Sequence, residues 1–349
     1  MKHVHWKKEL PRLRPSPSRY GSPWYMLVAA VLISLQATGC QDFFGLRPGP
    51  APLPASLPTT QAFHVLEAGL SDPDPRVRSS AIEVIVQTRQ SRLMPKVKRS
   101  IRDQIVPVRF SALVAMGELR YSLAKRDIHQ IFNEENENPS VRLAAAYALD
   151  RLGEKQYANH YYDAITSMDM TLRANSALLL GRSGDRNTLK LLYWALEDRD
   201  SDDRVLQQAI ESVAMMGDEK IYQKLWTELI SAYADDRIHG IRGMGHLGTE
   251  PAKQALATLL EDPVLEVRLA AAEQLGRYND PVGQYRVQEA FKPDLNRDAA
   301  AQIRIKVMAA MAIGEIGTGS LIQHLPRLLN DASPFVRIAA AKAALRQQM

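Results

Sequence analysis

Hydrophobic and polar positions recur along this chain with a period of little more than thirty residues. Aligned on one mostly basic position, nine copies follow one another at intervals of 31, 33, 31, 33, 31, 31, 38 and 31 residues. The preceding residue is aliphatic in eight copies, with Asp236 the exception. The residue three places after is small in all nine, and the residue seven places after is apolar in all nine. Positions −1, +3, +4 and +7 share one face of an α-helix, so each copy predicts a helix with a buried face and a close neighbour.

Second amphipathic segments lie between these helices, for example at residues 188–198, 251–262 and 321–331. Each unit is therefore predicted to be two antiparallel helices joined by a short turn. One such pair cannot bury its apolar faces, whereas stacked pairs bury a continuous core. The pattern predicts an all-α solenoid of about nine helical hairpins over residues 61–349.

Several copies read alike, such as NPSVRLAAAYALDRLG at 138–153 and DPVLEVRLAAAEQLG at 262–276. This pattern resembles the HEAT repeat, and its period is similar to that of the short HEAT-like class first known from phycobilisome lyases. The resemblance covers residues 61–349 and implies a right-handed α-α superhelix of the HEAT or armadillo kind. It is specific for fold and weak for function. Two units depart from it: Leu206 stands in the basic position, and the 38-residue interval predicts a longer loop or a kink near residues 292–298.

The basic position begins the second helix of each unit. An acid often lies six residues earlier, as at Asp72, Asp103, Asp200, Asp262 and Asp331. In the family, such acids and arginines stack into a ladder along the turns, and the planar guanidinium can pair with carboxylates and carbonyls together. We favour this structural role over an anion-binding stripe. The expected ladder residues are Arg78, Arg109, Arg142, Arg173, Arg237, Arg268, Lys306 and Arg337.

Second helices of HEAT arrays usually line the concave face, and positions +5 and +9 point away from the core. A polypeptide-binding groove is one interpretation of this row, and ordinary surface variation is the other. The candidate groove residues are Val114, Tyr147, Leu178, Glu211, His239, Arg242, His246, Glu273 and Met311. A metal site on the two histidines is disfavoured, because residues seven apart on a helix lie about 10.5 Å apart along its axis.

Aromatic residues gather between positions 147 and 233. Tyrosine and tryptophan serve both as core filler and as interface anchors. Since most of these residues fall on first helices, we expect core positions for them, with Tyr147 as the exception in the candidate groove.

The first sixty residues have a different character. A basic segment, the apolar run 26–35 and small residues before Cys40 describe a secretory signal peptide over residues 1–39. Ala37-Thr38-Gly39-Cys40 resembles the bacterial lipobox, which implies lipid attachment at Cys40 and a membrane anchor. An incidental thiol after an ordinary cleavage site is the alternative. Proline alternates with small residues in the following stretch, so residues 40–60 are predicted to be an extended tether.

The net charge of +5 belongs to the predicted signal peptide, which holds six basic residues and one acid. The remainder has 44 − 6 = 38 basic and 39 − 1 = 38 acidic residues. Nucleic-acid binders usually carry a basic excess, so no nucleic-acid partner is expected. A single cysteine excludes an internal disulfide and any cysteine-rich zinc module. No metal and no cofactor are expected.

Three functions fit these features. The favoured one is a membrane-anchored, non-catalytic scaffold that binds other proteins in the cell envelope. The second is an enzyme similar to the phycobilin lyases or to deoxyhypusine hydroxylase, whose iron site uses His-Glu pairs; none of the eight histidines here is followed by Glu. The third is an envelope-sensing or cell-wall binder. We predict a protein that is not an enzyme, exported and held at the inner or outer membrane of a bacterium.

Overall fold

The computed structural model describes residues 57–292 and 298–348. Cys40, the predicted signal peptide and most of the predicted tether lie outside these ranges. Residues 57–60, which the sequence analysis assigned to the tether, belong to the first described helix. No helix within the described ranges is both long and apolar enough to cross a membrane.

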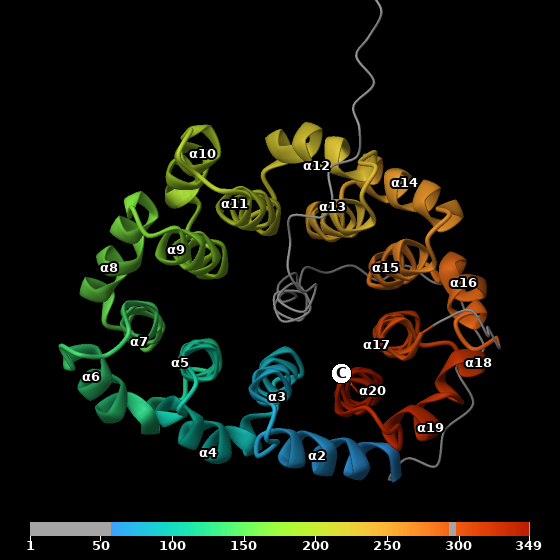
Figure 1. Ribbon diagram of the computed structural model, residues 1–349, viewed down its shortest axis with the longest axis horizontal. Helices are drawn as coiled ribbons and strands as arrows, with labels where there is room; N and C mark the ends of the chain where they lie inside the picture. Colours follow the sequence, from blue (N-terminus) through green and yellow to red (C-terminus); the bar gives the residue numbers. More distant parts are fainter. Residues whose placement is uncertain (1–56, 293–297, 349) are drawn as a thin grey trace, which may run out of the picture.

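Helices stand in two concentric layers (Figure 1). The inner layer consists of α3 (Pro75–Gln87), α5 (Val106–Glu118), α7 (Pro139–Arg151), α9 (Met170–Ser183), α11 (Asp203–Met215), α13 (Ala234–Leu247), α15 (Leu265–Gly276), α17 (Ala299–Ile316) and α20 (Pro334–Arg346). The outer layer consists of α2 (Leu57–Gly69), α4 (Met94–Val97), α6 (Lys125–Asn133), α8 (Ala158–Asp163), α10 (Leu189–Glu197), α12 (Tyr222–Leu229), α14 (Glu250–Thr258), α16 (Gln284–Glu289), α18 (Gly319–Ile322) and α19 (Leu325–Leu329). The predicted all-α solenoid of HEAT-like helical hairpins is confirmed.

Local sequence explains where the inner helices begin and end. Pro75 and Pro139 occupy first-turn positions, where the missing N–H costs nothing. The side chain of Asp74 accepts a hydrogen bond from the backbone N–H of Arg76 at 2.9 Å. Gly184 ends α9 in the left-handed conformation at φ 69°, which L side chains rarely adopt.

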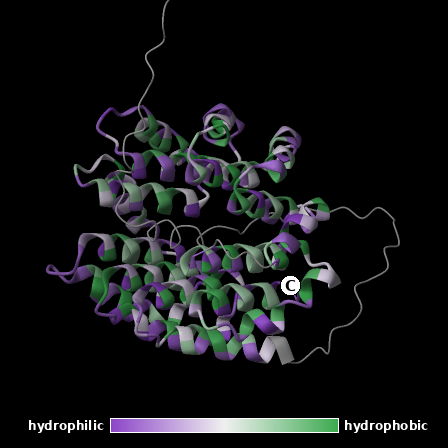
Figure 2. Cartoon of the chain, turned by 45° about the vertical axis from the view of Figure 1, so that its right-hand side comes forward, coloured by the Kyte–Doolittle hydropathy of each residue, from purple (hydrophilic) through white to green (hydrophobic). Residues whose placement is uncertain are grey.

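The small residues expected from the repeat lie where helices meet. A Cβ added to Gly240, at position +3, would lie 3.0 Å from the carbonyl oxygen of Leu225 on the outer helix of the same hairpin. A Cβ on Gly181, at position +8, would lie 2.6 Å from Ser212 on the next inner helix. The two positions therefore set two different contacts, one within a hairpin and one between hairpins. Apolar and polar segments alternate along the helices, as amphipathic packing requires (Figure 2).

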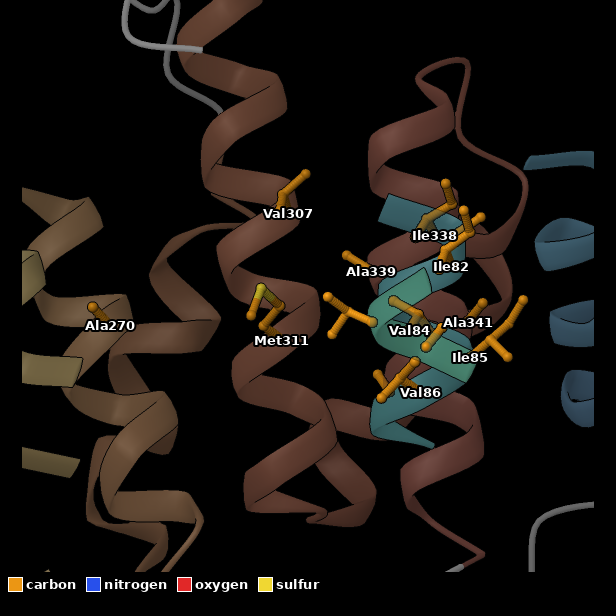
Figure 3. Close-up of a cluster of buried hydrophobic side chains, with 14 of the residues drawn as sticks. Ile82, Val84, Ile85, Val86, Ala270, Val307, Met311, Ile338, Ala339 and Ala341 are labelled. Atoms are coloured by element: carbon orange, nitrogen blue, oxygen red, sulfur yellow. The ribbon is translucent and has the colours of Figure 1, made fainter. Parts of the chain in front are cut away.

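The array closes into a ring, which the sequence analysis did not predict. Helix α20 packs against both α2 and α3, and α19 packs against α2. Gln61 donates a hydrogen bond to the Oδ1 atom of Asn330 at 2.8 Å, and the Arg76 guanidinium lies 5.7 Å from the Phe335 ring centre. Figure 3 shows Ile82 and Ile85 of α3 beside Ile338 and Ala341 of α20. The last repeat thus buries its apolar face against the first.

The 38-residue interval lengthens a helix. Helix α17 begins seven residues before Lys306, whereas α3 begins three residues before Arg78. Four of the extra residues therefore add about one turn to α17. Most of the predicted loop, residues 293–297, lies outside the described ranges.

Candidate functional site

A ladder of basic side chains follows the turns that join outer to inner helices. The Nη1 atom of Arg78 donates to the carbonyl oxygen of Asp72 in its own turn at 2.8 Å. Its Nε and Nη2 atoms donate to the two carboxylate oxygens of Asp103 in the next repeat, each at 2.8 Å. The Asp103 carboxylate also accepts the backbone N–H of Ile105 at 2.9 Å. One arginine therefore ties two turns together, and one carboxylate caps the second turn.

The same two-sided contact recurs around the ring. Arg237 donates to both carboxylate oxygens of Asp262 at 2.8 and 2.9 Å and to the Ser231 carbonyl at 2.9 Å. Further ladder contacts join Arg109 to Glu137 at 2.6 Å, Arg173 to Asp198, Arg268 to Glu289 at 3.3 Å, and Lys306 to Asp331 at 2.7 Å. Arg337 donates to the carbonyl oxygen of Asp331 at 2.8 Å.

Two rungs differ from the rest. Arg142 donates to the carbonyl oxygen of Phe132 at 3.1 Å, and the residue 25 places on is Ser167 rather than an acid. Leu206 has no donor, and the residue 25 places on is again a serine, Ser231. Where the carboxylate is missing, the arginine therefore either turns to another acceptor or is replaced.

The ladder changes the ionisation of its acids. Partial burial by itself would raise the pKa of Asp103, but the hydrogen bonds from Arg78 and from the Ile105 N–H hold that pKa below its ordinary value. Asp331 behaves alike: burial opposes ionisation, and Lys306 nevertheless keeps the pKa of this carboxyl lowered. Both acids are therefore ionised partners in the folded ring.

The candidate groove row lies on the inner helices, but its side chains are not open. Glu211 and Glu273 are buried, and so are the row's apolar members: Val114, Tyr147, Leu178 and Met311. These six positions were expected to line an open groove, and in the structure they are buried. Figure 3 shows Val307 of α17 on the side toward α3 and α20.

Charged side chains on the inner helices pair across repeats that are not neighbours. An Arg182 nitrogen of α9 lies 3.3 Å from a carboxylate oxygen of Glu83 on α3. Lys342 of α20 lies 3.9 Å from Glu273 of α15. Between two neighbouring repeats, the Tyr147 hydroxyl of α7 donates to Glu118 of α5. These contacts bring together residues up to 99 positions apart.

Burial perturbs several of these groups. It raises the pKa of Glu83 to about 7, and the neighbouring Arg182 limits the rise. Burial also raises the pKa of Glu211 and Glu273 above the ordinary carboxyl range. The pKa of Tyr147 is raised well above its ordinary value by burial and by the Glu118 charge. Perturbed carboxyl groups beside a tyrosine and a guanidinium can exchange protons near neutral pH.

The three polar candidates on α13 are half-buried and have contacts beyond their own helix. The Nδ1 atom of His239 lies 2.8 Å from Glu228 of the outer helix α12. Burial disfavours its charged form, yet Glu228 raises the pKa of His239. Burial and then Arg277 hold the pKa of His246 well below its usual value. Within the described ranges, no group of three or more His, Cys, Asp or Glu residues is arranged to hold a metal ion.

Exposed aromatic residues are the feature that sequence reasoning missed. Trp194 and Trp226 are each 39% exposed, and Tyr233 is 65% exposed, although core positions were expected for the aromatics of this region. The spacing of the apolar residues along α12 could have revealed this exposure. Tyr222, Trp226 and Ile230 recur every fourth residue, whereas the buried residues of α12 are Leu225 and Leu229. Tyr222 packs partly against the core, and Trp226 and Ile230 are the exposed members of this spacing.

No family model matches the chain, and no curated protein matches it. Solved structures of similar fold include the complex of CpcE and CpcF of phycocyanin lyase from Nostoc sp. PCC7120. It is 17% identical with a TM-score of 0.40, and the match covers 72% of this chain and 94% of that one. Human deoxyhypusine hydroxylase is 15% identical with a TM-score of 0.34, covering 83% and 97%. Likeness at this level concerns the HEAT-like fold alone.

The sequence analysis predicted that the chain is not an enzyme, and these findings contradict that prediction. Two proteins of similar fold are a lyase and a hydroxylase by name. The prediction rested on missing motifs, but catalytic groups assemble from residues distant in the chain and need share no motif. We therefore withdraw it.

Proposed function

We propose that the chain is an exported, lipid-anchored repeat ring that binds a protein partner in the bacterial cell envelope. Cys40 follows an apolar run and small residues, as a lipidated cysteine does, and a proline-rich stretch separates it from the ring. The ring itself contributes a rigid body, because each repeat packs against the next and most are also joined by the ladder.

One observation carries the binding role. Nine large hydrophobic side chains are exposed in the described ranges, and five of them fall between positions 168 and 233: Met168, Trp194, Trp226, Ile230 and Tyr233. Exposed apolar side chains gathered in one region mark interaction surfaces more often than single scattered ones do. Tryptophan and tyrosine are also enriched among the residues that dominate binding energy.

Cross-linking in the native envelope tests this function. The intact, membrane-held protein is cross-linked in its host, purified and analysed by mass spectrometry, beside a Cys40→Ser control. We expect a defined protein partner for the native chain and a loss of membrane attachment for the control. A native chain that captures no protein at any position overturns the proposal.

A second candidate function, catalysis by the inner helices, is favoured by the Glu83, Glu118, Tyr147 and Arg182 cluster. A carboxyl with a pKa of about 7 beside a guanidinium is suited to general acid–base work. The chain purified from its host is analysed for a bound pigment or small metabolite. Catalysis predicts that Glu83→Gln loses such a molecule whereas Glu67→Gln, at a half-exposed carboxyl of α2 that pairs with Lys96, retains it. Equal retention by both variants contradicts the second candidate.

A further inference from the structure

An apolar stripe of the outer helix α12 begins at Tyr222, which packs partly against the core, and continues to side chains that are exposed to solvent. Tyr222, Trp226 and Ile230 are spaced by four residues, so they share a face of the helix. The Trp226 ring stacks on Tyr222 with centroids 6.3 Å apart and an interplanar angle of 18°. Ile230 is 68% exposed, and Tyr233 in the following turn is 65% exposed. The stack holds the indole in place before any partner arrives, which lowers the entropy cost of binding.

The chain around this stripe is strongly acidic. Residues 197–236 contain eleven acids and four basic residues, a difference of 4 − 11 = −7. Residues 40–349 as a whole are balanced, as counted above, so the negative charge is local to this part of the ring. Asp200 and Asp235 are among its exposed carboxylates.

The ladder edge of this region lacks a rung. At most other junctions a basic side chain reaches an acid of the next turn, as Arg78 reaches Asp103. Between α11 and α13 neither member of the pair is present, because Leu206 stands in the basic position and Ser231 in the acidic one. The turn at residues 230–233 and the acidic turn at 198–202 both connect an outer to an inner helix, so they lie on the same edge of the ring. The edge therefore carries exposed apolar side chains beside negative charge.

We propose that Trp226, Ile230, Tyr233, Asp200 and Asp235, here named the acidic aromatic surface, dock a basic polypeptide segment that carries an apolar anchor residue. This inference rests on the proposed protein-binding function and names its partner's chemistry. Charge complementarity decides which kind of partner fits this surface. Anionic phospholipid and nucleic acid are repelled by this surface, and a second copy presenting the same surface is repelled as well.

Binding of defined peptides to the full-length protein in detergent tests the chemistry. The first probe is a fluorescent peptide of lysine, leucine and tryptophan; the second has lysine with serine in place of the apolar residues; the third has glutamate in place of lysine. We expect the first probe to bind at least tenfold more tightly than either other probe at 0.15 M salt. Equal binding of the first two probes overturns the proposal.

Variants locate the binding. Trp226→Ala with Ile230→Ser is expected to weaken the first probe about tenfold, and Asp200→Asn with Asp235→Asn is expected to reduce both its affinity and its salt dependence. The matched control is Leu123→Ser with Val282→Ser, two exposed apolar residues of other repeats. An equal loss in the control and the surface variant overturns the proposal. So does a native dimer that the surface variant dissociates.

Cross-linking from Tyr233 in the native envelope separates this inference from the proposed function. A photoreactive residue at position 233 is expected to capture a protein that Trp226→Ala with Ile230→Ser no longer captures. If positions elsewhere on the ring capture a protein but position 233 does not, the binding function stands and the assigned surface is wrong. If no position captures a protein, both fail.

Discussion

The junction between α13 and α15 and the junction between α11 and α13 are built on the same repeat but held differently. At the first, Arg237 makes a two-pronged ion pair with Asp262, and both side chains are buried. At the second, Leu206 and Ser231 occupy the corresponding positions, so the ion pair has lost both members. Stacking continues across both, because α11 still packs against α13. Helix packing therefore builds the ring, and the ladder adds stability and sets the charge of the edge.

The largest expected effect comes from breaking the paired junction. Arg237→Ala leaves Asp262 buried without its partner and should lower the free energy of unfolding by about 3 kcal/mol. Thermal and urea denaturation measure the change. Arg237→Lys keeps the charge but loses the planar fork of the guanidinium. Its free energy of unfolding should therefore lie between those of the native protein and the alanine variant. A loss under 1 kcal/mol for the alanine variant contradicts the importance of this rung.

The closing junction between α20 and α2 extends the comparison to a contact that no chain connection holds. A Cβ on Gly69 would lie 2.9 Å from the Ala81 Cβ and 3.2 Å from the Ile338 Cδ1. Gly69→Val should therefore cost about 2 kcal/mol through overpacking. Hydrogen exchange should speed up in α20 as well as in α2.

Gly319→Val is the matched control for this variant, since nothing lies within 4 Å of a Cβ added there. Faster exchange in α2 alone would argue for an open array rather than a ring.

A rung made of lysine tests how far geometry matters. Lys306 is 36% exposed and makes one hydrogen bond to Asp331, at 2.7 Å. Lys306→Ala should lower stability by about 1 kcal/mol or less, because solvent screens the pair. Parallel denaturation of the Lys306 and Arg237 variants gives the comparison. Losses of equal size would mean that burial and the two-pronged contact contribute nothing.

The smallest expected effect comes from restoring the missing rung. Leu206→Arg alone finds serine at position 231 and should change stability by less than about 0.5 kcal/mol. Combined with Ser231→Asp, it regains the spacing of Arg78 and Asp103. A double-mutant cycle should show a favourable coupling of about 0.5 kcal/mol. If the effects of the two single substitutions on stability simply add, the two side chains are too far apart at this junction to form an ion pair.

Much of the architecture follows from the repeat itself. The positions at −1, +3 and +7 predicted the inner helices, and the second amphipathic segments predicted the outer ones. The spacing of Arg78 and Asp103 predicted that the turns carry paired charges, since the same two residue types recur once per repeat. The choice of acid was not predicted in every repeat: Arg173 pairs with Asp198, whereas the acid six residues before the next basic position is Asp200.

The candidate site was predicted less well, and the reason is physical. Periodicity says which face of a helix turns away from its own hairpin, but not what meets that face from elsewhere in the molecule. Tyr147 was expected in an open groove and is buried against Glu118. His239 was grouped with Arg242 on α13, and the contact with Glu228 of α12 was not predicted. Trp226 was expected in the core and is exposed.

The sequence by itself determined the repeat, its two helices, its small contact residues and the places where a rung is missing, because each depends on residues within one or two units. Tertiary structure alone decided that the array closes. Closure depends on small rotations between neighbouring repeats that add up around the chain, and no single repeat records their sum. The curvature of the array likewise brings Glu83 of α3 and Arg182 of α9 within 3.3 Å, although they are 99 positions apart.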